Sequence, residues 1–130
     1  MALSRILPDT CAWIDFFRGR PTPLAETLGE SLLRVEVFTC GAVLYELLQG
    51  IKNPGEEEQV KNGLQALSYL EMTRDLWSSA AQLSSQLRAS GHTLPFSDIM
   101  IAAIALNHGC AVLTIDRHFE VIPGLIIVNA

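Results

Sequence analysis

The sequence has 130 residues and a mass of 14.2 kDa, a length that predicts one domain over residues 1–130. Hydrophobic residues make up 49% of the chain and charged residues 18%, which excludes a disordered tail, and no apolar stretch approaches the ~20 residues of a membrane span. Nine basic against fourteen acidic residues give a net charge of −5, the wrong sign for a protein that holds nucleic acid by bulk electrostatics. We therefore expect a cytoplasmic protein with no membrane segment.

The first half of the chain alternates short apolar runs with stretches of helical spacing. In chain order these predict a strand at Arg5–Leu7, a helix at Cys11–Arg18, a helix at Leu24–Leu32, a strand at Val35–Phe38 and a helix at Gly41–Gln49. Pro8 closes the first strand, where its missing amide is not needed. Thr10 and Thr39 precede the first and third helices, and we expect their hydroxyls to cap them.

The second half continues the same alternation. It predicts helices at Glu56–Leu70, Leu76–Ser90 and Asp98–Asn107, a strand at Ala111–Ile115, a turn at Asp116–Phe119 and a last strand at Leu125–Val128. Ser97 is expected to cap the last helix, which is apolar all round from Ile99 to Leu106 and so is buried between other elements or at a subunit interface. Short apolar strands that alternate with helices predict an α/β fold with a parallel sheet.

The three cysteines, Cys11, Cys40 and Cys110, are scattered along the chain without a CxxC pair. Free cysteine is among the most buried residue types. We therefore expect reduced core residues.

Acidic residues follow two of the predicted strands and open one helix. Asp9 and Asp116 each come directly after a strand, and loops at the carboxyl ends of parallel strands meet in one crevice, so these two side chains are expected to be neighbours. Asp98 lies in the first turn of the helix that leads to the strand before Asp116, where the helix dipole favours its ionised form. It can reach the same crevice.

Glu46 lies off the core face of its predicted helix. At ~100° per residue it is about 130° from the centre of the apolar stripe. Its neighbours one turn away are Ala42 and Gly50, whose small size leaves room for an ion or a phosphate.

Three or four carboxylates in one pocket would repel one another and raise some pKa values, unless a hard divalent cation supplied the opposite charge. Mg²⁺ or Mn²⁺ fits a set of oxygen ligands, whereas zinc prefers His or Cys, and the three histidines His92, His108 and His118 show no ligand spacing among themselves or with the cysteines. Each carboxylate also has an ordinary alternative role: Asp9 as a helix cap, Asp98 as a first-turn charge, Asp116 as a turn former and Glu46 as a solvated residue.

Four segments, in this order, resemble the PIN-domain ribonucleases of the VapC toxin type: Asp9–Gly19 (DTCAWIDFFRG), Tyr45–Gly50 (YELLQG), Phe96–Ala103 (FSDIMIAA) and Leu113–Phe119 (LTIDRHF). The resemblance implies a PIN-like fold, a short parallel sheet flanked by helices. It implies an endoribonuclease that hydrolyses RNA phosphodiester bonds with Mg²⁺ or Mn²⁺, forms a homodimer and is inhibited by a cognate antitoxin whose segment crosses the acidic groove.

Carried over by position, the resemblance implies a quartet of catalytic and metal-binding residues: Asp9, Glu46, Asp98 and Asp116. Thr10 matches the small hydroxyl residue beside the first Asp, and Thr114 matches the polar residue at the end of the last strand before the site. Many relatives carry another Asp two residues after the last acidic position, where this chain has His118.

Residues around the quartet have both a functional and a structural interpretation. The arginines are candidate phosphate contacts or solvated surface charges: Arg18, Arg20, Arg74, Arg88 and Arg117. Asp15 is assigned to structure, paired with an arginine, and Trp13 and Phe17 to the core or a dimer interface rather than to stacking on RNA bases.

Competing enzyme classes lack their defining residues. A Cys-His-Asp arrangement can be drawn from Cys11 or Cys110, but nothing in the sequence marks either thiol as activated. A response-regulator receiver needs paired acids and a late strand-end lysine, and a haloacid-dehalogenase-type phosphatase needs Asp-x-Asp where this chain has Asp9, Thr10 and Cys11. The alternative that stays open is a catalytically inactive PIN-fold module that binds a protein partner.

Overall fold

The computed structural model describes residues 3–129. Its elements, in chain order, are β1 (Arg5–Pro8), α1 (Thr10–Phe17), α2 (Pro23–Arg34), β2 (Glu36–Cys40), α3 (Gly41–Gln49), α4 (Pro54–Gln65), β3 (Ser68–Leu70), α5 (Arg74–Ala89), α6 (Phe96–His108), β4 (Ala111–Leu113), the 3₁₀ helix η1 (Arg117–Val121) and β5 (Ile127–Val128). Among the described residues, no helix is long and apolar enough to span a bilayer.

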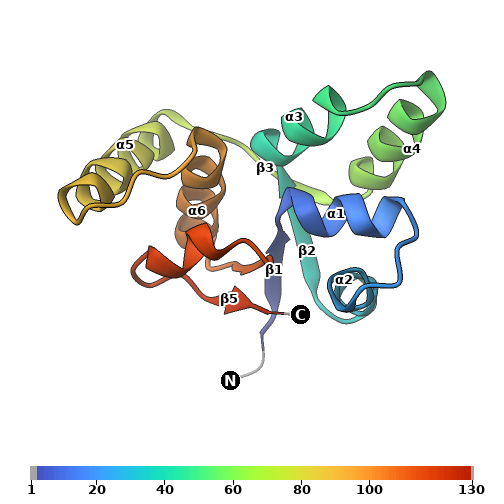
Figure 1. Cartoon of the computed structure of the whole chain (residues 1–130), viewed down its shortest axis with the longest axis horizontal. Helices are drawn as coiled ribbons and strands as arrows, with labels where there is room; N and C mark the ends of the chain where they lie inside the picture. The colour runs from blue at the N-terminus through green and yellow to red at the C-terminus, as the bar shows by residue number, and fades with distance from the viewer. Residues whose placement is uncertain (1–2, 130) are drawn as a thin grey trace.

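The strands form one five-stranded sheet in the order β3-β2-β1-β4-β5, and every pairing is parallel. The chain runs from β1 outward through β2 to β3, then returns to the other side of β1 with β4 and β5 (Figure 1). The strand order therefore reverses beside β1. In open parallel sheets the crevice for a ligand lies at such a point, outside the carboxyl ends of the strands. The predicted α/β fold with a parallel sheet is confirmed.

Helices cover the sheet from two sides. In Figure 1, α5 and α6 lie on the left of the view and α1 to α4 on the right, with β1 and β2 between them. Leu7 of β1, Trp13 of α1 and Val112 of β4 are almost completely buried and belong to one hydrophobic cluster. Residues 99–105 of α6 are buried on every side, as expected for a helix that is apolar all round. Burying these side chains supplies most of the driving force for folding.

The hydroxyl residues predicted to cap three helices do not do so. Asp9 is the cap of α1 and accepts a hydrogen bond from the backbone amide of Thr10, which is already the first helical residue. The predicted cap Thr39 lies inside β2, and α3 starts after Cys40 without a side-chain cap. The helix α6 starts after Pro95, so Ser97 is its second residue. The hydroxyls of Thr10 and Ser97 instead donate hydrogen bonds to the carboxylate of Glu46 on α3.

The predicted helix over Glu56–Leu70 is wrong in its second half. The helix α4 ends at Gln65, and Ser68–Leu70 form β3, the edge strand that pairs with β2. Leu64, Leu67 and Leu70 keep a helical spacing, which hides the strand in the sequence. Pairing with an existing strand decides the structure of this segment.

The cysteines are free. Cys40 and Cys110 are buried, as expected, whereas Cys11 is only half-buried and lies at the crevice beside β1. The core interpretation therefore holds for two of the three.

Candidate active site

The acidic side chains come from four elements that converge beside β1. Asp9 follows β1, Glu46 is on α3, Asp98 is in the first turn of α6, and Asp116 caps η1 just after β4. Asp9 and Asp98 are 5% and 6% exposed, unusually low values for carboxylates. The four predicted site residues, which are distant in the sequence, are thus brought to one crevice.

Thr114 connects two of these carboxylates. Its hydroxyl donates to Asp9 Oδ2 over 2.9 Å and accepts from the backbone amide of Asp116, also over 2.9 Å. Thr114 is 1% exposed, so both hydrogen bonds are shielded from water. The expectation that Asp9 and Asp116 are neighbours is confirmed, and Thr114, predicted only as a polar residue at a strand end, is what holds them in register.

Glu46 is held by two hydroxyls from other helices. Its Oε1 accepts from Thr10 Oγ1 at 2.7 Å, and its Oε2 accepts from Ser97 Oγ at 3.1 Å. These bonds tie α3 to the beginnings of α1 and α6, and hold the Glu46 carboxylate close enough to Asp9 for its charge to raise the pKa of Asp9. The sequence predicted Ser97 only as a helix cap, and its hydrogen bond to Glu46 is seen only in the structure.

Open space lies beside Glu46, as its small neighbours predict. A groove of about 650 Å³ is bounded by Ala42, Glu46 and Ser97 and continues over exposed aromatic side chains. The aromatic residues are Tyr45, Tyr69, Trp77 and Phe96. A second, smaller groove next to Glu46 is lined by Ile14 and Arg18.

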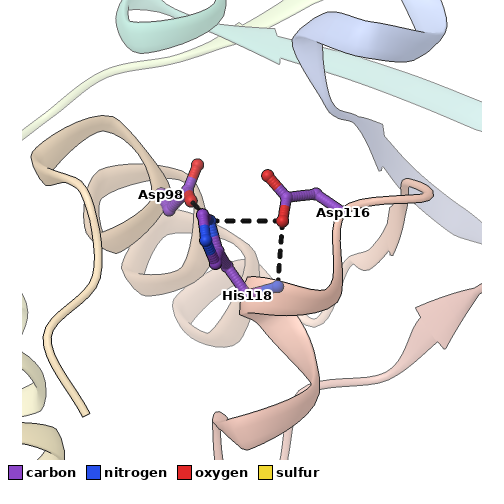
Figure 2. Close-up of side chains that lie close together, drawn as sticks. All are labelled: Asp98, Asp116 and His118. Atoms are coloured by element: carbon purple, nitrogen blue, oxygen red, sulfur yellow. Dashed lines mark hydrogen bonds and ion pairs between the residues drawn. The ribbon is translucent and has the colours of Figure 1, made fainter.

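His118 is a member of the cluster that the sequence did not indicate as one. Its Nδ1 lies 2.9 Å from Asp98 Oδ2 and 3.2 Å from Asp116 Oδ1 (Figure 2). Its backbone amide also donates to Asp116 Oδ1 at 2.9 Å, which fixes the start of η1. The signal in the sequence is the spacing of His118 two residues after Asp116, a histidine next to a carboxylate rather than next to another histidine or a cysteine.

Burial and like charge act on the protonation of this cluster. Burial raises the pKa of Asp9, although hydrogen bonds from Thr114 and Thr10 partly offset the effect. Burial also raises the pKa of Asp98, opposed by its hydrogen bond to His118. The pKa of His118 is raised, first by the hydrogen bond to Asp98 and then by the charge of Asp116. The pocket therefore holds more carboxylates than the single His118 imidazole can balance, which is the condition under which a divalent cation binds.

The structure does not support a cysteine nucleophile. Burial and the nearby Asp9 raise the pKa of Cys11, whose sulfur contacts Asp9 at 3.6 Å and Thr114 at 3.7 Å. Burial raises the pKa of Cys110 too, and its thiol donates only to the backbone carbonyl of His108. Among the described contacts, neither thiol has an imidazole that could take its proton, and both stay protonated near neutral pH.

Asp15, Trp13 and Phe17 have the structural roles that the sequence predicted for them. Asp15 pairs with Arg20 at 3.2 Å and accepts from Thr22. Trp13 is buried and stacks on Phe17 with ring centroids 5.5 Å apart. Both aromatic residues therefore serve packing within the chain.

The chain is similar to known proteins over most of its length. The family model described as "PIN domain" matches residues 6–125. The chain is similar to the VapC ribonuclease Mb1587 of Mycobacterium bovis, with 29% identity over 127 residues and 92% of each chain covered. It is also similar to the ribonuclease VapC4 of Mycobacterium tuberculosis, with 28% identity over 134 residues and 99% of each chain covered.

Solved structures with the same fold include VapBC proteins bound to DNA. The DNA-bound VapBC of Salmonella typhimurium matches with a TM-score of 0.79 and 26% identity, over 98% of each chain. The promoter-bound VapBC2 of Rickettsia felis matches with a TM-score of 0.81 and 17% identity, over 96% of this chain and 98% of that one.

Proposed function

The chain belongs to the PIN domain family, and from this premise we propose that residues 1–130 act as a single-domain, toxin-type endoribonuclease that hydrolyses RNA phosphodiester bonds. The observation that carries the proposal is the convergence of Asp9, Glu46, Asp98 and Asp116 in one crevice, two of them nearly buried. The similarity to VapC ribonucleases over almost the whole chain supports RNA as the substrate.

The donor set of the crevice fits Mg²⁺ or Mn²⁺. Carboxylate oxygens are the ligands these ions prefer, and the burial that raises the pKa of Asp9 and Asp98 is offset when a cation is bound. We assign the ligand role to the acidic quartet. When bound, a divalent ion would supply Lewis-acid activation of water and stabilise charge on the leaving oxygen.

The chain's own residues then have positioning roles. Thr114 holds the Asp9 carboxylate, and Thr10 and Ser97 hold that of Glu46, so that neither has to be ordered when RNA arrives. The protonated Cys11 thiol donates to Asp9 and takes no part as a nucleophile. Water is therefore the attacking group in the proposed hydrolysis.

We also propose a cognate antitoxin as partner and a homodimer as the assembled form. The VapBC complexes among the similar structures support the antitoxin. A segment with a basic side chain would match the charge of the crevice and block it. The exposed aromatic groove beside Glu46 supports an interface with a second copy.

The first experiment is cleavage of total cellular RNA by the purified chain without a partner, in Mg²⁺ or Mn²⁺ and in EDTA. We expect discrete fragments that disappear in EDTA. The variant Asp98→Asn should cleave at least about 100-fold more slowly, since even outer contacts of metal sites cost ~10–100-fold. Asp75→Asn, an exposed carboxylate in the first turn of α5, is the matched control and should cleave like the wild type.

The outcomes separate the two candidate functions. Cleavage that persists in folded Asp98→Asn contradicts the proposed mechanism. A folded wild-type chain that neither binds a divalent ion nor cuts RNA favours the alternative, a PIN-fold module that holds a protein partner without catalysis.

A further inference from the structure

The imidazole of His118 is placed between two carboxylates of the crevice rather than beside one. The ligand atoms of Asp98, Asp116 and His118 all lie within 4.8 Å of one another (Figure 2). These three side chains come from the start of α6 and from the turn after β4. A nitrogen atom therefore lies within coordination range of two carboxylates of the proposed metal site.

The distances suit a shared cation. Two ligands that bind an octahedral ion at right angles, each ~2.1 Å from it, are about 3.0 Å apart. His118 Nδ1 is 2.9 Å from Asp98 Oδ2 and 3.2 Å from Asp116 Oδ1. In the protein without metal, a proton on Nδ1 accounts for both contacts, and a cation can take the place of that proton.

The surroundings of His118 allow the ring to act as a ligand. Its backbone is fixed by the hydrogen bond to Asp116, so the ring starts from a defined position. The side chain is 51% exposed, which leaves room for an ion and its waters on the open side. Coordination through Nδ1 leaves the proton on Nε2, which makes no hydrogen bond among the described residues.

A nitrogen ligand changes which ion the site prefers. Mg²⁺ loses its water reluctantly and is bound almost always by oxygen, whereas first-row transition ions accept imidazole readily. Mn²⁺ combines a preference for carboxylates with tolerance of a nitrogen donor.

We propose that His118 is a direct nitrogen ligand of the divalent ion held by Asp98 and Asp116, and that it makes the site selective for Mn²⁺ over Mg²⁺. This inference rests on the proposed function, since it uses the same site, and it names the ion that the acidic quartet leaves open.

The test uses Mn²⁺ alone as the probe, bound to the full chain without RNA. Pulsed electron paramagnetic resonance detects nitrogen directly bonded to Mn²⁺, and labelling histidine with ¹⁵N shifts that signal. We expect histidine nitrogen coupling in the wild type and in His92→Ala, an exposed histidine in the turn after α5. The coupling should be absent in His118→Ala.

Binding affinities give a second readout. Calorimetric titration with Mn²⁺ and Mg²⁺ should show a ratio of affinities that falls at least ~10-fold in His118→Asp, because an oxygen donor replaces the nitrogen. Circular dichroism should be unchanged in each variant, since the His118 side chain is half exposed.

Failure of the inference is distinct from failure of the proposed function. Mn²⁺ bound without nitrogen coupling, together with an unchanged affinity ratio in His118→Asp, overturns the role of His118 and leaves the nuclease intact. A wild-type chain that binds neither ion overturns both.

Discussion

Thr114 is the residue on which the arrangement of the crevice most depends. One hydroxyl joins the carboxylate of Asp9 to the backbone that carries Asp116, and it does so where water cannot replace it. A buried hydrogen bond to a charged group contributes more than one between neutral groups.

Thr114→Val keeps the shape of the side chain and removes the hydroxyl. We expect the free energy of unfolding to fall by about 1.5–3 kcal/mol, because the buried Asp9 carboxylate loses one of its hydrogen-bond donors. Urea denaturation at neutral pH measures the change.

Thr114→Ser is the matched control, since it keeps the hydroxyl and loses a methyl group worth ~1 kcal/mol. If Thr114→Val is as stable as Thr114→Ser or more so, the hydrogen bond does not hold the site together.

At this scale the sequence predicted the acidic residues better than their partners. Asp9 and Asp116 could be placed together because a carboxylate after a parallel strand has a defined position. Their hydrogen-bond partners could not be predicted, since a hydroxyl at the start of a helix can either cap that helix or bind a side chain from another element. The local rule gives Thr10 and Ser97 to helix caps, but in the folded chain both bind Glu46. Which use prevails depends on a carboxylate far away in the sequence.

Among the elements, α4 and α1 make an unusually close contact. A Cβ atom built at Gly63 would lie 2.8 Å from the ring of Phe17, which itself stacks on Trp13. Gly29, inside α2, has only an ordinary contact of 3.8 Å to Phe16. The two helical glycines therefore have different reasons for being glycine.

Substituting both by alanine separates the two reasons. Gly29→Ala should raise the free energy of unfolding by about 0.5–1 kcal/mol, because alanine is the better helix former. Gly63→Ala should lower it by about 1 kcal/mol, since moving the Phe17 ring costs ~1–3 kcal/mol and exceeds the same gain. Chemical denaturation of both variants gives the comparison, and equal stabilisation by the two would show that Phe17 yields freely.

The elements themselves were predictable where they were long. The helices α2, α5 and α6 were expected close to their observed bounds. The strand β3 was not, because three residues at the edge of a sheet leave too little pattern to interrupt the helical spacing that precedes them. This segment is a strand because it pairs with β2, and a local sequence pattern does not show such pairing.

For the molecule as a whole, the parallel α/β class followed from the alternation of strands and helices, but the strand order did not. The pairing of β4 with β1 joins two segments that are far apart in the sequence, and no local sequence pattern indicates which strands pair. The existence of a crevice could therefore be predicted from the fold class, but the residues that line it could be predicted only in part.

The charge of the crevice gives the metal-free chain a definite dependence on pH. The raised pKa values of Asp9 and Asp98 mean that their ionised forms cost free energy, a cost relieved as the pH falls through those raised values toward 3.8. The raised pKa of His118 means that its charged form stabilises the fold below 6.5 and that this contribution is lost as the pH rises through the raised value. All three groups bind more protons in the folded state.

We therefore expect the contribution of these groups to the free energy of unfolding in EDTA to fall as the pH rises, above 3.8 for Asp9 and Asp98 and above 6.5 for His118. Asp98→Asn should flatten this dependence, because it removes one raised carboxyl and the main partner of His118. Urea denaturation at several pH values, for the wild type and the variant, measures both slopes. If the free energy of unfolding depends on pH as steeply in Asp98→Asn as in the wild type, Asp98 and His118 are not the source of the pH dependence.

The bond between Thr114 and Asp9 joins residues 105 positions apart, and this has a consequence for how the protein is made. On a ribosome, Asp9 emerges early and Asp98, Asp116 and His118 emerge late, so a growing chain holds only part of the crevice. Until β4 has taken its place beside β1, no cutting centre can exist. A cell that synthesises this chain thus meets its activity only after the chain has been translated through His118 and β4 has paired with β1.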